Sequence, residues 1–260
     1  MAKVPSFEVA GARIDAVTLD ATIKILEEWI RERRREYVVL LGAHGIVEMQ
    51  SEPKLRQVDN AAGLVTPDGM PNVWLGKWKG YREIEKVYAP DIMSAAFTRG
   101  LELGWRHFFY GGKEGVADAL ADRMRARHPG IVIAGTYCPP FRALSDAEVA
   151  TVARQINDSR PDLVWVGLGC PKQDFWMARF RPHLDAPVLL GVGAGFDFLS
   201  GTMPLAPRWV QRSGFEWLYR LFSDPRRLWP RYSRVIPRFM VVFLREVLRG
   251  RHRAPRGAVA

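Results

Sequence analysis

Six short apolar runs, rich in β-branched and aromatic residues, alternate with amphipathic stretches along most of the 260-residue chain. The amphipathic stretches repeat apolar residues at the spacing of a helix. Strands that alternate with helices form a parallel sheet covered on both faces, so we predict an α/β, Rossmann-like fold. The expected strands are 37–41, 63–66, 107–110, 131–136, 163–166 and 188–192, and the expected helices are 53–60, 91–103, 115–127, 146–157 and 173–180.

Two further elements are expected before the first of these strands. The segment "FEVAGARID" predicts a tight hairpin around Gly11. Thr18 is a suitable N-cap for a helix that follows it, because Ile23, Leu26 and Ile30 recur at helical spacing. In parallel α/β sheets, ligands bind beyond the carboxyl ends of the strands, so the loops at those ends are where we look for chemistry.

The charge of the chain is concentrated at its carboxyl-terminal end. The net charge is +10, and residues 206–260 hold thirteen arginines, three acidic residues and no lysine. The preceding 205 residues balance 25 basic groups against 25 acidic ones. Helices interrupted by Pro225, Pro230 and Pro237 are expected there, because proline breaks helices. We therefore divide the chain into an α/β catalytic domain, residues 1–205, and a basic helical appendage, residues 206–260.

Aromatic side chains are interleaved with the arginines of this appendage, and Trp209, Trp217 and Trp229 are among them. Such a mixture suits the headgroup layer of an anionic membrane, where each basic residue contributes roughly 1 kcal/mol. The longest apolar run, 239–244, is far shorter than the roughly twenty residues that cross a bilayer, so we expect peripheral attachment. Nucleic acid attracts basic segments too, but no known nucleic-acid module is visible. Simple packing and a protein partner stay open.

Asp68 directly follows an expected strand in the segment "LVTPDGMP", and Gly69 allows a sharp turn after it. A carboxylate at this edge of the sheet would face the ligand cleft and could act as a general base. An Asx-turn or a helix N-cap is the alternative use of an aspartate in such a place. The local pattern leaves both interpretations open.

Glycine-rich loops follow other strands at the same edge. In "VWVGLGCPKQDFW", Gly169 lets a ligand approach the backbone, and the helix that begins near Pro171 offers free N–H groups to an anion. Gln173 falls in the first turn of that helix. Gly111 ends another strand, and His44 follows the first one closely. An ordinary strand-to-helix turn is the alternative interpretation of such loops.

Several motifs are absent from the sequence. There is no Walker motif, and "GVGAGFDF" lacks the Gly-x-Gly-x-x-Gly spacing of a dinucleotide site. No Asp-x-Asp, His-x-x-x-His or Cys-x-x-Cys pattern suggests a metal. We therefore expect no metal and no cofactor. Cys170 has no evident partner base, so a bystander thiol is the favoured interpretation.

Three segments resemble the WecG/TagA/CpsF glycosyltransferases, which form glycosyltransferase family 26. The segments "TPDGMPNVW" and "VGLGCPKQDFW" and residues 191–232 have the order and spacing of that family. The resemblance covers residues 7–232. It implies an inverting, metal-independent enzyme that moves a hexose, N-acetylmannosamine or its uronate from a UDP-sugar to a polyprenyl-diphosphate-linked sugar. The site of action it implies is the cytoplasmic membrane face, in cell-surface polysaccharide synthesis.

The resemblance also implies roles for individual residues. Asp68 matches the proposed base, and Gln173 matches the active-site glutamine. Asp197 matches the acidic residue of a Phe-Asp-Phe motif. Arg220 and Arg227 match appendage arginines that close over the donor diphosphate. The mechanism would then need positive charge from the appendage in place of a metal ion.

The chain departs from the family pattern in three places. The stretch "LLGAH" stands where the family often has Thr-x-Asn, so a polar sugar contact is missing, and we expect His44 to replace it. Lys86 stands where arginine is common. Ala89 replaces the glycine of Gly-Pro-Asp, whose Asp91 remains. These changes bear on the donor sugar more than on the reaction class.

One competing function belongs to another class of protein. A basic, nucleic-acid-binding or scaffold protein that uses a nucleotide-binding fold would also carry an arginine-rich end. An NAD-dependent enzyme that modifies nucleotide sugars is a weaker alternative, because the dinucleotide motif is missing. A homo-oligomer is left open.

Overall fold

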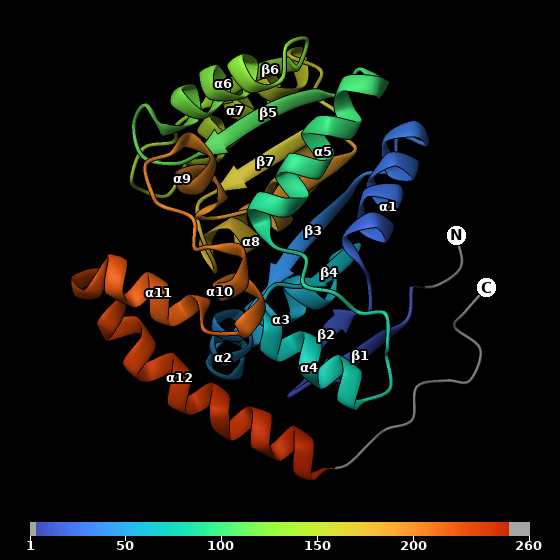
Figure 1. Ribbon diagram of the computed structural model, residues 1–260. Coiled ribbons are helices and arrows are strands. Elements are labelled where there is room, and N and C mark those ends of the chain that lie inside the picture. Colours follow the sequence, from blue (N-terminus) through green and yellow to red (C-terminus); the bar gives the residue numbers. More distant parts are fainter. Residues whose placement is uncertain (1–3, 250–260) are drawn as a thin grey trace.

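The computed structural model describes residues 4–249 and contains the parallel sheet that the sequence predicts (Figure 1). Six strands pair in the order β4-β3-β8-β7-β5-β6, and each neighbouring pair is parallel. Every expected strand is confirmed to within one residue at each end. The strands are β3 (Glu36–Leu41), β4 (Leu64–Pro67), β5 (Arg106–Gly111), β6 (Val132–Tyr137), β7 (Leu163–Gly167) and β8 (Val188–Gly191).

Side chains of the central strands alternate between two separate apolar cores. Val164 and Val166 of β7 belong to one core, and Leu163 and Trp165 belong to the other. Helices cover both faces, as expected for a parallel sheet. The first core includes side chains of α2 (Ala43–Ser51), α3 (Pro53–Asn60), α7 (Asp146–Asp158) and α8 (Lys172–Phe180). The second includes side chains of α1 (Leu19–Arg31), α5 (Ala89–Leu103), α6 (Val116–Arg127) and α9 (Gly195–Ser200).

The elements expected before the sheet are confirmed as well. Strands β1 (Ser6–Val9) and β2 (Ala12–Asp15) form an antiparallel hairpin, and its two turn residues, Ala10 and Gly11, both have positive φ. The main-chain N–H of Ala21 donates to the Thr18 hydroxyl at 3.1 Å and thereby caps α1. The five other expected helices are present as α3, α5, α6, α7 and α8. Helix α4 (Met70–Trp78), α2 and α9 were not expected, and a short 3-10 turn spans Arg181–His183.

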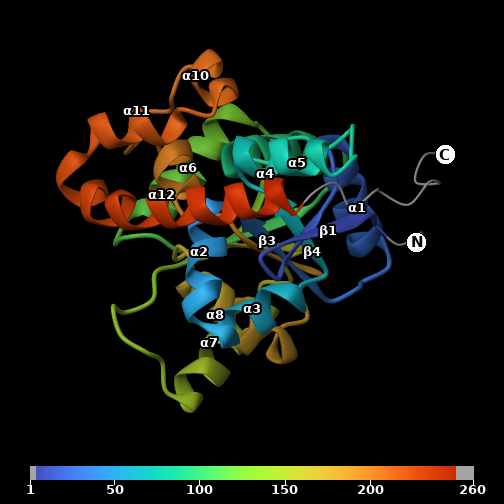
Figure 2. The same ribbon diagram turned by 90° about the horizontal axis from the view of Figure 1, so that it is seen from below.

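The arginine-rich end forms three helices within the described residues, α10 (Arg208–Ser213), α11 (Glu216–Ser223) and α12 (Pro225–Leu248). We call residues 206–249 the arm. In Figure 1, the arm lies on the side of the sheet toward which the β3 arrow points. Figure 2 shows α12 crossing α2 and α4, which it contacts. No helix within residues 4–249 has the length and apolar character needed to span a bilayer.

The expected interruption of the arm by three prolines is partly wrong. Pro225 begins α12, where a missing N–H costs nothing, but Pro230 and Pro237 lie inside this continuous helix. An internal proline costs about 3 kcal/mol. The helix persists because one face of it is buried against the body, with Val235 and Phe239 part of the first apolar core. The division into a catalytic domain and an appendage stays a prediction, and residues 250–260 lie outside the described range.

Candidate active site

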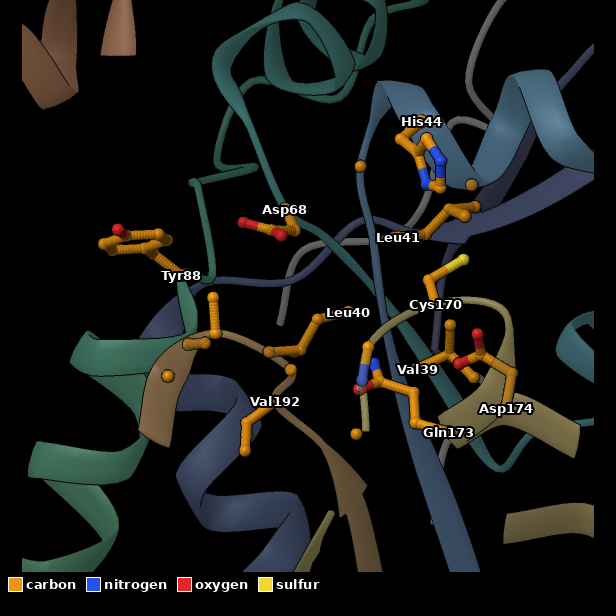
Figure 3. Close-up of a pocket in the computed structure, with 18 of the residues that line it drawn as sticks. Val39, Leu40, Leu41, His44, Asp68, Tyr88, Cys170, Gln173, Asp174 and Val192 are labelled. Atoms are coloured by element: carbon orange, nitrogen blue, oxygen red, sulfur yellow. Dashed lines mark hydrogen bonds between the residues drawn. The ribbon is translucent and has the colours of Figure 1, made fainter. Parts of the chain in front are cut away.

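A pocket opens at the carboxyl ends of β3, β4, β7 and β8, where the sequence predicted ligand binding. Four loops that follow these strands line it, together with two arginines of the arm. Figure 3 shows the lining side chains, with Asp68 and Tyr88 on one side and Gln173, Cys170 and Asp174 on the other. The lining includes His44, Asp59, Asp68, Tyr88, Gly169, Cys170, Gln173, Asp174, Phe198, Arg220 and Arg231.

Asp68 is the first residue after β4, and its backbone is held firmly. Its main-chain N–H donates to the carbonyl oxygen of Leu41 at 3.0 Å, which also accepts from the Asn72 side-chain amide at 2.7 Å. A Cβ atom at Gly42 would lie 3.0 Å from the Asp68 carbonyl oxygen, so glycine lets the two loops meet. The N-cap of α4 is Gly69, and no side chain caps that helix. The N-cap interpretation of Asp68 is therefore wrong, and its carboxyl faces the pocket (Figure 3).

The surroundings of Asp68 place its proton equilibrium close to neutral pH. Burial raises the pKa of this carboxyl to about 6, against the opposing effects of the Arg220 and Lys86 charges, while Glu216 adds to the increase. A carboxyl with this pKa is mostly ionised at pH 7 and is still basic enough to accept a proton from a hydroxyl group. Such tuning is typical of a general base.

Arg220 of α11 reaches over the pocket and is fixed by several contacts. Its guanidinium donates to the Tyr88 hydroxyl at 2.8 Å and to Glu216 at 2.7 Å. The guanidinium carbon lies 4.8 Å from the centre of the Phe198 ring. Planar guanidinium groups suit diphosphate oxygens, so Arg220 is placed to bind an anion beside Asp68.

Lys86 attaches the arm to the body, and it is not among the residues that line the pocket. Its Nζ lies 3.1 Å from Oε2 of Glu216 and donates to the Gln211 carbonyl oxygen at 3.3 Å. Burial opposes ionisation of Glu216, but the charges of Arg220 and Lys86 outweigh it and lower the pKa of that carboxyl. A single carboxylate of the arm thus links Lys86 of the body to Arg220.

Gln173 lies in the pocket wall, where its side chain supports the loop before α8. Its carbonyl oxygen Oε1 accepts from the main-chain N–H of Gly169 at 3.0 Å. A Cβ atom at Gly191 would lie only 2.8 Å from Nε2 of Gln173, so the end of β8 must be glycine for the amide to fit. With Oε1 occupied, the Nε2 group is the part of Gln173 that suits donation to a ligand.

His44 also lines the pocket, in agreement with its expected position. Its Nε2 lies 3.2 Å from Oε1 of Glu48, one turn further along α2. Burial, with a smaller effect of the Arg231 charge, lowers the pKa of His44 to about 4. The imidazole is therefore neutral at pH 7. Its buried Nδ1 has no hydrogen-bond partner among the described residues, so His44 offers a neutral polar contact.

Three other expected site residues are not part of the pocket lining. Asp91, at the start of α5, accepts from Arg208 at 2.9 Å and so binds the arm. Gly111 packs against Gly167, whose carbonyl carbon would lie 2.8 Å from a Cβ atom there. Asp197 is in the first turn of α9, next to the lining residue Phe198. The Arg227 side chain lies outside the described part of the chain. The roles of all these residues stay predictions.

Sequence analysis did not identify four of the polar residues in the lining. Tyr88 and Arg231 lie close in sequence to residues that were identified, but nothing local distinguishes them. Asp59 and Asp174 lie inside predicted helices, where an acidic residue usually faces water. Within residues 4–249, no group of three or more His, Cys, Asp or Glu side chains is arranged to hold a metal ion.

Comparison with known proteins gives a consistent picture. Residues 7–253 match the model of the Glycosyl transferase WecG/TagA/CpsF family. Two curated relatives carry the name N-acetylglucosaminyldiphosphoundecaprenol N-acetyl-beta-D-mannosaminyltransferase. The one from Bacillus spizizenii (strain ATCC 23059 / NRRL B-14472 / W23) is 29% identical over 220 residues, which cover 84% of this chain and 82% of the relative. The one from Bacillus subtilis (strain 168) is 30% identical over 190 residues, which cover 72% and 70% respectively. Since the family match extends over most of the sequence, this chain belongs to the WecG/TagA/CpsF family of glycosyltransferases.

Proposed function

We propose that this glycosyltransferase moves a sugar from a UDP-sugar to a polyprenyl-diphosphate-linked sugar, with inversion at the anomeric carbon and without a metal ion. The observation that carries the proposal is that Asp68 of the body and Arg220 of the arm line one pocket. The names of the two curated relatives support a lipid-diphosphate acceptor and an N-acetylmannosamine donor.

Asp68 accepts the proton of an acceptor hydroxyl in this mechanism. The hydroxyl oxygen forms a bond to the anomeric carbon while the bond from that carbon to the UDP oxygen breaks on the opposite face. Negative charge then grows on the leaving diphosphate. Arg220 stabilises that charge, and Arg227 is expected to assist it. Fixed positive groups aimed at developing charge are commonly the largest contribution to catalysis.

We expect the arm to shift when the donor binds. The pocket encloses about 160 Å³, whereas small-molecule sites commonly span roughly 300–1,000 Å³. Helix α11 has no fully buried residue, and Glu216 links it to Lys86 at 3.1 Å. A small displacement of α11 would break this contact and enlarge the pocket, and the arginines would return once the diphosphate is bound.

Exposed aromatic side chains of the arm support peripheral attachment to a membrane. Trp209, Phe222 and Trp229 are 75%, 78% and 63% exposed, and the arm carries most of the excess arginine. Basic and aromatic groups together favour the headgroup layer of an anionic bilayer. We place the enzyme at the cytoplasmic membrane face, where a lipid-linked acceptor is within reach.

The decisive experiment measures UDP release with and without a short-chain lipid-diphosphate N-acetylglucosamine acceptor. UDP-N-acetylmannosamine, its uronate and UDP-glucose are the donors, and the assays contain EDTA or Mg²⁺. We expect acceptor-dependent release with one donor, unchanged by EDTA, and a product of inverted anomeric configuration by NMR. Release that needs Mg²⁺, or a retained configuration, would contradict the mechanism. Salt-sensitive DNA binding without any UDP-sugar turnover would favour a nucleic-acid function instead.

A vesicle assay tests the membrane proposal separately. Sedimentation with phosphatidylglycerol vesicles should bring down the wild-type chain, and replacing Trp209, Phe222 and Trp229 by serine should release it. Replacing the exposed Trp78 of the body by serine is the matched control. Equal sedimentation of all three proteins would exclude the arm aromatics as the membrane contact.

A further inference from the structure

Two further carboxyl groups, both buried, belong to the wall of the pocket. Asp59 is near the end of α3 and Asp174 is in the first turn of α8, and these two helices pack together. The exposed fractions of the two residues are 0% and 1%. Both residues line the pocket. None of their four carboxyl oxygens has a hydrogen-bond partner in normal geometry among the described residues.

The groups around this pair do not neutralise it. The pKa of the Tyr37 hydroxyl, on β3, is raised to about 12. Burial is the main cause, and the charges of Asp59 and Asp174 add to it. Cys170 is the thiol that faces Asp174 (Figure 3). On the pocket side lie Arg231 of α12 and His44 of α2. His44 is neutral, and neither Arg231 nor His44 has a hydrogen bond or ion pair to the two carboxyls among those found in residues 4–249.

Two ionised carboxylates in this setting would be strongly disfavoured, because each is desolvated and repels the other. Burial, with repulsion from Asp174 second, raises the pKa of Asp59 to about 8. Burial raises the pKa of Asp174 to about 7, although the Cys170 thiol acts in the opposite direction. Such a pair titrates as a unit, so its first proton is lost well before its second.

The pair also borders Gln173, which lies in the first turn of α8. Asp174 is the next residue in the chain, and Cys170 lies in the loop before α8. The Gln173 side chain holds this loop through its hydrogen bond to Gly169. Any force that separates α8 from α3 therefore acts directly on the position of Gln173.

We propose that Asp59 and Asp174 share a proton at neutral pH and that this singly charged pair positions the 169–173 loop in the pocket wall. The two carboxyls act as positioning residues and do not contact the substrate. Loss of the second proton leaves two charges that push α3 and α8 apart, and Gln173 then moves out of place. The part that concerns Gln173 rests on the proposed function, whereas the shared proton does not.

Thermal unfolding as a function of pH tests the shared proton without any activity. A carboxyl whose pKa is higher in the folded protein stabilises the fold at low pH, and that stabilisation is lost as pH rises from the unfolded-state pKa, about 3.9, to the folded-state pKa. We expect the Tm of the wild-type chain to fall relative to that of Asp59→Asn between about pH 4 and about pH 8, by roughly 2–4 °C or more. Asp174→Asn should behave alike, whereas Asp20→Asn, at an exposed site on α1, should follow the wild type. Parallel curves for all four proteins would overturn the shared proton.

If neither buried variant folds, NMR of the wild-type protein measures the titration of the aspartates directly. The carboxyl carbon signals of ¹³C-labelled wild-type protein report the titration of each aspartate, and the signal of Asp68 is identified by its loss in Asp68→Asn. Two coupled aspartate titrations above pH 6, in addition to that of Asp68, are the expected result. If every aspartate other than Asp68 titrates below pH 5, the proposal is wrong.

The pH profile of kcat/KM tests the link to Gln173. In the wild type we expect kcat/KM to fall at least tenfold per two pH units above about pH 8, as the pair loses its second proton. The amide in Asp59→Asn imitates a permanently protonated partner, so this substitution should remove the alkaline decline of kcat/KM. An alkaline decline that persists in Asp59→Asn would exclude the positioning role even if the pair does share a proton. If the enzyme shows no transfer at any pH, the proposed function fails, but the unfolding and NMR results still decide the shared proton.

Discussion

The body and the arm of this protein are stabilised in different ways. Apolar side chains in the body fill two cores on either side of the sheet, and the central strands are almost fully buried. In the arm, α11 has no fully buried residue, and several large apolar side chains face outward. Within residues 4–249, three ion pairs connect the arm to the body, Arg208–Asp91, Lys86–Glu216 and Lys79–Glu246.

The different packing of the body and the arm suits their different proposed roles. Hydrophobic burial holds the body in one arrangement, which suits a base that must be positioned closely. Helix α12 packs one apolar face on the body, whereas α11 has no fully buried residue and is linked to the body through Glu216. The position of α11 therefore responds to anything that competes for those charges. A diphosphate is such a competitor, because it binds arginine well. In the proposed mechanism, the body supplies a fixed base, and α11 supplies positive charge that can adjust.

The largest expected effect concerns the fixed group of the body. Asp68→Asn keeps the shape of the side chain but removes its basicity, and general bases contribute roughly 10²–10⁴-fold to rate. We expect kcat to fall by that factor while UDP binding, measured by calorimetry, stays close to wild type. Asp20→Asn, at an exposed site, should be fully active. Turnover close to that of the wild type in Asp68→Asn would remove the base from the mechanism.

The second effect concerns the deepest contact between arm and body. Nζ of Lys79 lies 2.7 Å from Oε2 of Glu246, and both side chains are over 90% buried. Glu246 also accepts from the main-chain N–H of Ala10 at 3.2 Å. Replacing one partner of a buried ion pair costs about 3–5 kcal/mol where the remaining charge is uncompensated, and Arg249, which lies 3.6 Å from Oε1 of Glu246, offsets part of that cost here. We expect Lys79→Met to release α12, seen as faster amide hydrogen exchange in that helix.

Two further variants show whether the charge is the cause. The double variant Lys79→Met with Glu246→Leu removes both charges and should restore most of the protection of α12. Lys24→Met breaks only the exposed pair with Asp20, which is worth about 0–1 kcal/mol, and should change nothing in α12. If Lys79→Met leaves exchange in α12 unchanged, apolar packing alone is enough to hold α12 on the body, and the ion pair adds nothing to it.

The third effect concerns the adjustable charge of the arm. Arg220→Ala removes the guanidinium beside Asp68 and should lower kcat/KM by about 10²-fold, the usual effect of losing one group that stabilises the transition state. Arg212→Ala removes an exposed arginine of the same arm and is the matched control. Steady-state kinetics with a saturating acceptor measures both. Equal losses in the two variants would mean that the arm acts through its total charge rather than through a placed side chain.

The sequence predicts the body far better than it predicts the arm and the pocket. Strands such as 163–167 are recognisable because their apolar residues are contiguous. The start of α1 is recognisable because Thr18 has a hydroxyl group that can cap a helix. Helices α2 and α4 have no side-chain N-cap and contain Gly45 and Gly76, so local signals for them are weak. Helix α12 continues through Pro237 because of packing against the body, which local sequence does not encode.

In the candidate site, too, the residues next to strand ends could be predicted, whereas the contacts made by tertiary packing could not. Asp68, Gln173 and His44 were found because each follows a strand at a known edge of a parallel sheet. Asp59 and Asp174 line one pocket because α3 packs against α8, and the contact of Arg220 with Tyr88 depends on how the arm folds back. Both arrangements bring together segments that are distant in the sequence, so no local pattern predicts them.

The smallest expected effect is a shift in the pKa of Asp68, in the body, when the charge of Arg220, in the arm, is removed. As a base, Asp68 must be ionised, so kcat/KM should decline below about pH 6, the pKa to which burial raises this carboxyl. The Arg220 charge lowers that pKa, and Arg220→Gln should therefore move the acid limb of the profile to higher pH, in addition to reducing the rate. Arg220→Lys keeps a positive charge and should leave the limb near its wild-type position, although the rate falls because lysine lacks the planar fork. An acid limb at the same pH in the wild type and in Arg220→Gln would mean that the arm stabilises the leaving group without tuning the base, and the two regions would then contribute independently.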